Sequence, residues 1–238
     1  MNRRKRRYLS TWLVLTILLL ASGCRTQPTI SMATDAVPER PTVLVAAPAL
    51  CQQPDFPTGC EALTAVMALQ YAGETVSPAT FIDNHLTCDN KFYRKGLFLY
   101  GPDPYRVFVG NPRTKASYGC MAPVIEAALI DYFGDPLRVI NTTGTDIPTL
   151  CRQYIDRGIP VILWATSDMT PIKTGSRWRL EDGRLFTWPS GEHCLLLVGY
   201  NEDSYFFNDP KYGLTLPYLK AVTQQRYAEM GQQSLVIE

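Results

Sequence analysis

The segment His193–Tyr200, with the sequence HCLLLVGY, constrains the fold of this chain more than any other feature. Its continuous apolar run predicts a strand that is buried on both faces. A turn and a second apolar run, Tyr205–Asn208, follow it directly, so the two segments predict an antiparallel hairpin. Because other layers must cover both faces of such a strand, we expect a layered globular domain around it.

Helical patterns come before strand patterns along the chain. Thr58-Gly59-Cys60-Glu61 fits a capping box, in which Thr58 is the N-cap and Glu61 reaches back to it, and Gly73 ends this first helix. Further helices are predicted from Ser77-Pro78 through His85, over Pro123–Tyr132, over about Asp146–Arg157, and near Lys220–Met230.

The other strands are predicted mainly in the second half of the chain. They lie at Ile159–Ala165, in a hairpin over Arg177–Trp188 that turns at Asp182-Gly183, and at Leu235–Ile237. The stretch Asp89–Gly119, which is rich in Pro, Gly and Tyr, is expected to be irregular. Helices first and strands later predict an α+β fold with a mostly antiparallel sheet.

The N-terminus has the pattern of a targeting segment. A basic cluster, Arg3–Arg7, is followed by the apolar run Trp12–Ala21, which suits a signal peptide better than a bilayer span. An uncleaved membrane anchor is the alternative. The sequence Ala-Ser-Gly-Cys resembles the lipobox of bacterial lipoproteins, and this resemblance implies that Cys24 carries lipid and becomes the mature N-terminus. The protein is therefore expected to be exported and anchored to a membrane of the bacterial cell envelope.

Three segments follow from this interpretation. Residues 1–23 are the predicted signal peptide, residues 24–49 are a flexible tether rich in Pro, Thr, Ala and Val, and residues 50–238 form the domain. The cluster Arg3–Arg7 holds five of the 23 basic residues, so the rest of the chain has 18 basic against 22 acidic residues. A mildly acidic body argues against nucleic acid as a partner.

Seven cysteines occur in the chain, and one of them, Cys24, is assigned to the lipobox. The other six are Cys51, Cys60, Cys88, Cys120, Cys151 and Cys194. There is no C-x-x-C pair and there are only two histidines, so we expect neither a zinc site nor another cofactor. In an oxidising compartment some of these thiols are candidates for disulfides, and buried free thiols are the alternative.

Cys60 is the first candidate catalytic residue. In the predicted helix it lies in the first turn, where free N–H groups and the positive end of the helix dipole favour an anion. A thiolate is the nucleophilic form of cysteine, so this position is expected to lower the pKa of Cys60. The alternative is a small buried cysteine that fills space at the start of a helix.

His193, at the start of the buried strand, is the candidate base for Cys60. If the hairpin loop has three residues, His193 shares a face with Asp209, a diagonal neighbour roughly 7–8 Å away. If the loop has four residues, that face belongs to Asn208 instead. Either side chain is able to orient an imidazole, and the register alone does not choose between them.

An oxyanion needs hydrogen-bond donors as well. Gln52 and Gln53 lie just upstream of Cys60, whose own backbone N–H is a second donor. The rival base, His85, is expected to be a surface residue on a short helix. Four aromatic residues are candidates for lining a cleft, although core packing is the simpler interpretation: Tyr118, Trp164, Trp178 and Trp188.

The stretches QQPDFPTGCEALTAVMALQYAG and GEHCLLLVGYNEDSYFFNDPKYG resemble the C39-like group of papain-like cysteine peptidases, relatives of the bacteriocin leader peptidases that cut after double glycine. The resemblance implies a papain-like fold with the nucleophile on an N-terminal helix. It implies that Cys60 is the nucleophile, His193 the general base and Asp209 its orienter. Gln52 matches the oxyanion glutamine, with Gln53 as the fallback.

The implied activity is hydrolysis of a peptide or protein substrate through a thioester. No transporter or ATP-binding domain is attached, so processing of leaders during export is not implied, and Cys194 directly after the histidine is a possible site of competing oxidation. Two other functions use the same cleft: acyl transfer or cleavage of cell-wall peptides, and binding of peptides without catalysis.

Overall fold

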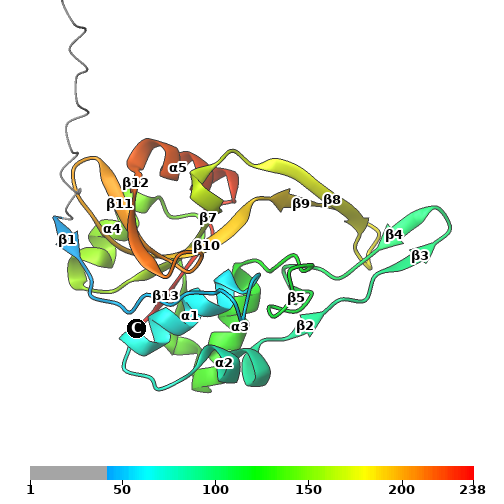
Figure 1. Cartoon of the computed structure of the whole chain (residues 1–238), viewed down its shortest axis with the longest axis horizontal. Coiled ribbons are helices and arrows are strands. Elements are labelled where there is room, and N and C mark those ends of the chain that lie inside the picture. Colours follow the sequence, from blue (N-terminus) through cyan, green and yellow to red (C-terminus); the bar gives the residue numbers. More distant parts are fainter. Residues whose placement is uncertain (1–41) are drawn as a thin grey trace, which may run out of the picture. The chain divides into compact units, whose positions relative to one another are not determined.

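The computed structural model describes residues 42–238. The predicted signal peptide, Cys24 and most of the predicted tether lie outside these residues. Within the described part of the chain, none of the helices has the length and apolar character needed to cross a bilayer. The domain has an α+β fold with a mostly antiparallel main sheet, as expected, and Figure 1 shows its arrangement.

The predicted hairpin lies inside the main sheet. Its strands are β10 (Glu192–Tyr200) and β11 (Ser204–Asp209), and β7 (Val161–Thr166) pairs with the other side of β10. The strand order is β12-β11-β10-β7-β13-β6, and all of these neighbours are antiparallel. The edge strands are β12 (Leu214–Leu219) and β6 (Val139–Asn141), and β13 (Ser234–Ile237) lies between β7 and β6. The apolar run that predicted a doubly covered strand is therefore the centre of the fold.

The helices follow the predicted order closely. They are α1 (Cys60–Tyr71), α2 (Pro78–His85), α3 (Ala122–Phe133), α4 (Ile147–Gln153) and α5 (Lys220–Glu229). Helix α1 packs against β10, α2 and α3 lie next to α1, and α5 packs against β7. Figure 1 shows α1, α2 and α3 together below the main sheet and α5 above it. All residues from Cys60 to Leu69 are buried, because α1 has neighbours on every side.

A second sheet extends from the body of the domain (Figure 1). It has the order β3-β4-β8-β9, and a separate parallel pair joins β2 to β5. The bounds are β2 (Cys88–Asp89), β3 (Tyr93–Lys95), β4 (Phe98–Tyr100), β5 (Phe108–Val109), β8 (Lys173–Arg179) and β9 (Leu185–Ser190). The stretch that we expected to be irregular therefore contains short strands. β3 pairs with β4, which joins the edge of β8, and β2 pairs with β5.

The ordered domain begins before Leu50. Val43–Leu44 form β1, which pairs with the end of β10, and the N–H of Val45 donates to the carbonyl oxygen of Val198 at 2.7 Å. A Cβ atom on Gly199 would clash with the backbone carbonyl of Val43, so the glycine of the HCLLLVGY run leaves room for this strand. The residues after Thr42 thus belong to the domain, although we expected them in the tether.

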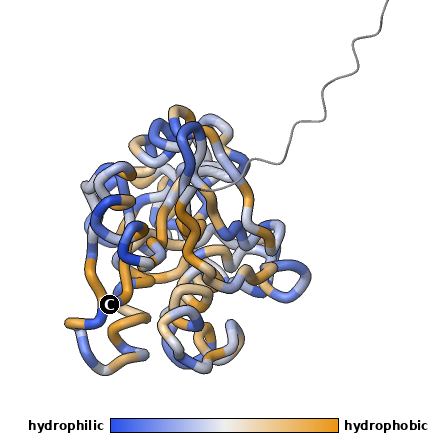
Figure 2. Tube along the Cα trace, turned by 90° about the vertical axis from the view of Figure 1, so that its left-hand side faces the viewer, coloured by the Kyte–Doolittle hydropathy of each residue, from blue (hydrophilic) through white to orange (hydrophobic). Residues whose placement is uncertain are grey.

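Side chains from both layers fill the core between α1 and the sheet. Figure 2 shows hydrophobic segments running through the middle of the domain, with others at its edge. Trp164, Trp178 and Trp188 are buried, and the indole N–H groups of the first two donate to the carbonyl oxygens of Cys120 and Pro102. These tryptophans have the packing role that was the simpler expectation.

Candidate active site

Helix α1 begins at Cys60, but without the predicted capping box. Gly59 is the N-cap, and no side chain caps the helix. The hydroxyl of Thr58 instead donates to the carbonyl oxygen of Thr114 at 2.9 Å, in the loop before α3. The capping prediction was wrong because long-range partners compete for both side chains of the motif, which sequence spacing does not reveal.

Glu61, the other member of the predicted box, points into the protein. Its Oε1 accepts a hydrogen bond from the N–H of Cys120 at 2.6 Å, and its Oε2 accepts one from the Sγ of Cys60 at 3.2 Å. The side chain is completely buried. Burial outweighs these hydrogen bonds and raises the pKa of Glu61 to about 7.

The Cys60 thiol is not the low-pKa group that its helix position predicts. Burial of the sulfur, followed by the negative charges of Glu61 and Glu192, raises the pKa of Cys60 above its ordinary value. Only 6% of the residue is exposed. Burial and the two carboxylates therefore act against the lowering of the pKa that a helix start favours.

Glu192 is a part of the site that the sequence interpretation missed. It directly precedes His193 on β10, and its carboxylate, that of Glu61 and the sulfur of Cys60 each offer an atom within 4.8 Å of the other two. Its Oε1 atom is buried and has no hydrogen-bond partner in the described part of the chain. Burial and the Glu61 carboxylate raise the pKa of Glu192.

The hairpin β10–β11 contains both of the registers that the sequence left open. Near the turn, Tyr200 pairs with Tyr205, as in the register of the four-residue loop. Farther along the same hairpin, Leu196 pairs with Asn208, as in the register of the three-residue loop. The loop length alone therefore did not determine which residue lies beside the histidine.

A β-bulge between Leu197 and Gly199 makes the change of register. As a result, the carboxylate of Asp209 lies beside His193, with 2.7 Å between its Oδ1 and the imidazole Nε2. The amide of Asn208 turns the other way and donates to the carbonyl oxygens of Ala47 and Pro48. The bulge thus places an aspartate at the ring.

Asp209 is fully buried and every oxygen of its carboxylate has a donor. Oδ1 also accepts from the N–H of Lys211 at 2.8 Å, and Oδ2 accepts from the hydroxyl of Tyr218 at 2.7 Å. Burial acts to raise the pKa of Asp209, but the bonds from His193, Tyr218 and Lys211 outweigh it and lower that pKa. The carboxylate is therefore held in its charged form.

A further layer of contacts surrounds this pair. The Nζ of Lys211 lies 2.6 Å from Oδ2 of Asp168, and the hydroxyl of Tyr212 donates to Oδ1 of Asp168 at 2.7 Å. These two bonds and the Lys211 charge lower the pKa of Asp168. Neither Asp168 nor Tyr218 belongs to a motif, so only the fold reveals that they support Asp209.

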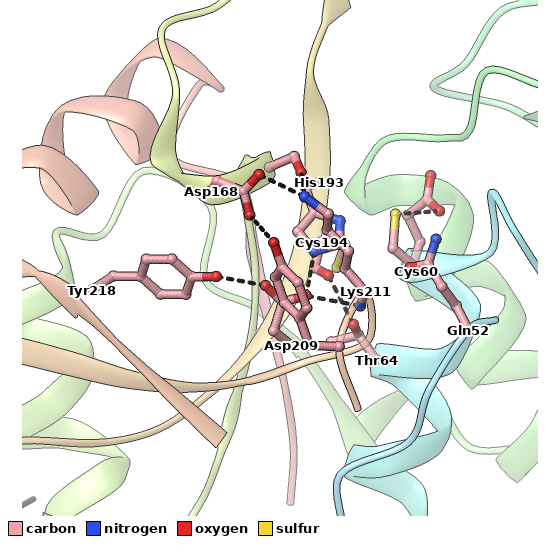
Figure 3. Close-up of polar contacts among 12 residues, drawn as sticks. Gln52, Cys60, Thr64, Asp168, His193, Cys194, Asp209, Lys211 and Tyr218 are labelled. Atoms are coloured by element: carbon pink, nitrogen blue, oxygen red, sulfur yellow. Dashed lines mark hydrogen bonds and ion pairs between the residues drawn. The ribbon is translucent and has the colours of Figure 1, made fainter. Parts of the chain in front are cut away.

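Helix α1 and strand β10 meet beside the two candidate catalytic residues. One turn after Cys60, the hydroxyl of Thr64 donates to the carbonyl oxygen of Cys194 at 3.1 Å. In Figure 3, Asp209 lies on one side of His193 and Cys60 on the other. Since Nε2 is bonded to Asp209, Nδ1 is the ring nitrogen that is left for Cys60. Within residues 42–238, no hydrogen bond joins Cys60 to His193, because the thiol is bonded to Glu61.

Gln52 lies next to Cys60 in Figure 3. It is buried, its backbone N–H donates to Pro210 at 2.7 Å, and its side-chain Nε2 donates to the carbonyl oxygen of Pro57 at 2.8 Å. Gln53 is exposed. Of the two candidate donors, the structure thus brings Gln52 to the site and leaves Gln53 outside it.

The other candidate residues lie away from this centre. Nδ1 of His85 is 2.7 Å from Oδ2 of Asp131, on the outer pair of helices α2 and α3. Tyr118 is partly buried and packs against Trp178 and Trp188. The six cysteines among residues 42–238 are all free thiols.

Comparisons with known proteins show the family of this chain and agree with its fold. The model of the Peptidase C39-like family matches residues 47–235. The chain belongs to the Peptidase C39-like family. It is 28% identical over 192 residues to the uncharacterized protein YvpB of Bacillus subtilis. The aligned region covers 79% of this chain and 74% of YvpB.

A solved structure has the same fold. The crystal structure of a protein described as a C39-like peptidase from Bacillus anthracis superposes with a TM-score of 0.72 at 23% identity, over 84% of this chain and 98% of that one. The papain-like α+β architecture expected from the sequence is therefore confirmed. Membership of the Peptidase C39-like family supports a peptidase-type, hydrolytic function.

Proposed function

We propose that this protein is a cysteine peptidase that hydrolyses peptide or amide bonds through a thioester on Cys60. The observation that carries the proposal is the buried pair of His193 and Asp209, which is held beside the helix that begins at Cys60. Membership of the Peptidase C39-like family supports the broader assignment to peptidases.

The first step is proton transfer from Cys60 to His193. The thiol leaves its bond to Glu61 by rotation of the side chain and gives its proton to Nδ1 of His193. The charged Asp209 holds the proton on Nε2 and stabilises the imidazolium that forms. The thiolate then attacks the substrate carbonyl, and a C–S bond forms.

Two donors are placed to stabilise the oxyanion. One is the backbone N–H of Cys60 at the open end of α1, and the other is the second amide hydrogen of Gln52, whose first is bonded to Pro57. His193 then gives its proton to the leaving amine as the C–N bond breaks. Water, activated by the same imidazole, hydrolyses the thioester and regenerates the thiol.

Labelling with a thiol-directed activity probe tests this proposal. We expect Cys60→Ala to abolish labelling and peptide cleavage, and His193→Ala to reduce both by at least about a thousandfold. Cys88→Ser is the matched control, because Cys88 is also a free thiol but is exposed and lies on β2. Full labelling of Cys60→Ala would contradict the assignment.

Two alternatives use the same cleft and give different products. If the acyl-enzyme passes to an amine instead of water, an added amine appears in the product, which mass spectrometry detects. If the domain only binds peptides, affinity is unchanged in Cys60→Ala and no turnover occurs with the wild-type protein. The complete set of Cys60, His193, Asp209 and Gln52 argues against binding without catalysis, whereas hydrolysis and acyl transfer use the same residues and are separated by their products.

The location is a separate proposal, since Cys24 lies outside the described residues. We propose that the chain is an exported lipoprotein with lipid on Cys24, because Ala-Ser-Gly-Cys follows an apolar run. Cells fed a fatty acid that carries a chemical tag should label the wild-type protein and not Cys24→Ser. Equal labelling of both proteins would exclude this site of lipidation.

A further inference from the structure

Three side chains with metal-ligating atoms meet at the start of α1, on the side away from Asp209. Cys60, Glu61 and Glu192 each offer a ligand atom, and these atoms all lie within 4.8 Å of one another. The closest pair is the Sγ of Cys60 and the Oε2 of Glu61, at 3.2 Å. The proposed peptidase mechanism uses the sulfur but neither carboxylate.

The two carboxylates of the cluster have no ion-pair partner in the described part of the chain. Among residues 42–238, no ion pair involves Glu61 or Glu192, although Glu61 is fully buried and Oε1 of Glu192 is buried with no hydrogen-bond partner. Burying a carboxylate without a partner is costly, so such a site favours a cation. Because Glu192 remains partly exposed, a small ion has a route to it from solvent.

The backbone leaves space for these carboxylates. Gly119 has a φ of +134°, and a Cβ atom there would clash with Oε1 of Glu61 and lie 3.3 Å from Oε2 of Glu192. The loop before α3 is therefore shaped so that both side chains reach the same space. The two glutamates come from α1 and from β10, which are far apart in the sequence.

We propose that Cys60, Glu61 and Glu192 bind a thiophilic divalent cation such as zinc, and that the bound cation holds the peptidase inactive. Inhibition rests on the proposed function, whereas binding does not. Zinc accepts one thiolate and two carboxylates, and its bonds of about 2.3 Å to sulfur and 2.0–2.2 Å to oxygen place the ligand atoms about 3.5 Å apart. A small movement of the flexible Glu192 side chain closes the site to that spacing.

The lack of a C-x-x-C pair and the small number of histidines bear only on zinc sites built from cysteine and histidine. Here carboxylates complete the set, as they do at many zinc sites. A cation on the sulfur occupies the electron pair that attacks the substrate carbonyl and keeps the side chain turned toward Glu61, away from His193. Removal of the cation releases the sulfur.

Zinc titration of the intact chain against a fluorescent zinc chelator tests the site. The wild-type protein should bind one more zinc ion than Cys60→Ala, and Glu192→Gln should weaken that site by at least about tenfold. Glu202→Gln, an exposed change on the β10–β11 loop, is the matched control and should bind as the wild type does. Because exposed Cys51 and Cys88 are free thiols that also bind metal, the difference between variants is the decisive quantity.

Activity measurements separate the two parts of the proposal. Stoichiometric zinc should slow alkylation of Cys60 by iodoacetamide and abolish peptide cleavage, and EDTA should restore both. Equal zinc stoichiometry in the wild type and Cys60→Ala overturns the site. Binding at Cys60 in a protein that shows no peptidase activity when freed of metal overturns the proposed function and leaves the metal site standing. Undiminished cleavage by the zinc-loaded protein overturns inhibition.

Discussion

The two sides of the site differ in how their charges are satisfied. On the sheet side, each carboxylate oxygen of Asp209 accepts a hydrogen bond, from His193, Lys211 or Tyr218. On the helix side, Glu192 has a buried oxygen with no partner in the described part of the chain, and it lies beside Glu61 and Cys60. On the sheet side the hydrogen bonds of Asp209 are complete and hold the imidazole of His193. On the helix side the buried oxygen of Glu192 gains a partner only from a proton, a substrate or a cation.

The pKa values of Asp209 and Glu61 shift in opposite directions, in line with this difference in hydrogen bonding. Donors lower the pKa of Asp209, whereas burial raises the pKa of Glu61 to about 7. A lowered pKa keeps the group charged, which suits a residue that orients an imidazolium. A raised pKa keeps it protonated until another charge arrives. The sheet side therefore keeps one fixed charge state at Asp209, whereas the helix side is able to change its charge state at Glu61.

Removing the carboxylate of Asp209 has the largest expected effect. Asp209→Ala should lower kcat/KM by about a thousandfold and the free energy of unfolding by about 3 kcal/mol, because three donors around a buried position lose their acceptor. Asp209→Asn keeps an acceptor oxygen but loses the charge, so it should recover much of the stability and little of the activity. Peptide cleavage and urea unfolding measure the two quantities. If Asp209→Ala cleaves peptide at the wild-type rate, the sheet side does not orient the base.

The raised pKa of Glu61 should make the stability of the protein depend on pH. The pKa of Glu61 is about 7 in the folded protein and about 4.5 in the unfolded chain, so the folded state holds the extra proton between these values. The stability of the wild type relative to Glu61→Gln should therefore fall by about 3 kcal/mol as the pH rises from 4.5 to 7. Denaturant unfolding at several pH values measures it. A flat difference would mean that the Glu61 carboxylate is charged throughout.

Asp209 should respond in the other direction. Its pKa is lower in the folded protein than in the unfolded chain, where an aspartate has a pKa of about 3.9. It therefore contributes stability above that pH, and the contribution is lost as the pH falls through the folded value. Unfolding of the wild type and of Asp209→Asn between pH 2 and 6 should show this loss in the wild type alone.

Tyr218 tests how much a single donor matters on the sheet side. Tyr218→Phe leaves Oδ2 of Asp209 without its hydrogen bond but keeps the ring in place. We expect a loss of about 1 kcal/mol in stability and about tenfold in kcat/KM. Tyr212→Phe, which removes only a bond to Asp168, is the control and should have a smaller effect. Equal effects of the two changes would show that the bond to Asp209 has no special role.

Glu192 tests the helix side with the smallest expected effect. Glu192→Gln removes one of the negative charges that raise the pKa of Cys60, so the pH profile of alkylation should move to lower pH. In metal-free buffer, the rate at pH 7 should rise a few-fold. An unchanged profile would mean that burial alone sets the reactivity of the thiol.

Much of the fold could be predicted because its signals are local. The apolar run of β10 and the glycine stop of α3 act within a few residues, and the observed elements match them. Helix α4 ends earlier than predicted, at Gln153, and Gly158 instead ends the short 3-10 turn that follows it. The short strands β3 and β4 escaped prediction because they depend on the edge of β8, which is far away in the sequence.

In the candidate site too, short-range features could be predicted from the sequence and long-range contacts could not. The sequence by itself determined that a cysteine begins a buried helix and that a histidine begins a buried strand, since apolar patterns and helix starts are short-range properties. Only the tertiary structure decided the surroundings of these residues. The bulge beside Gly199 brings Asp209 to the ring, and packing of α1 on β10 brings Glu61 and Glu192 to the sulfur. The physical reason is that burial and charge act through space between segments whose separation along the chain carries no information about their distance.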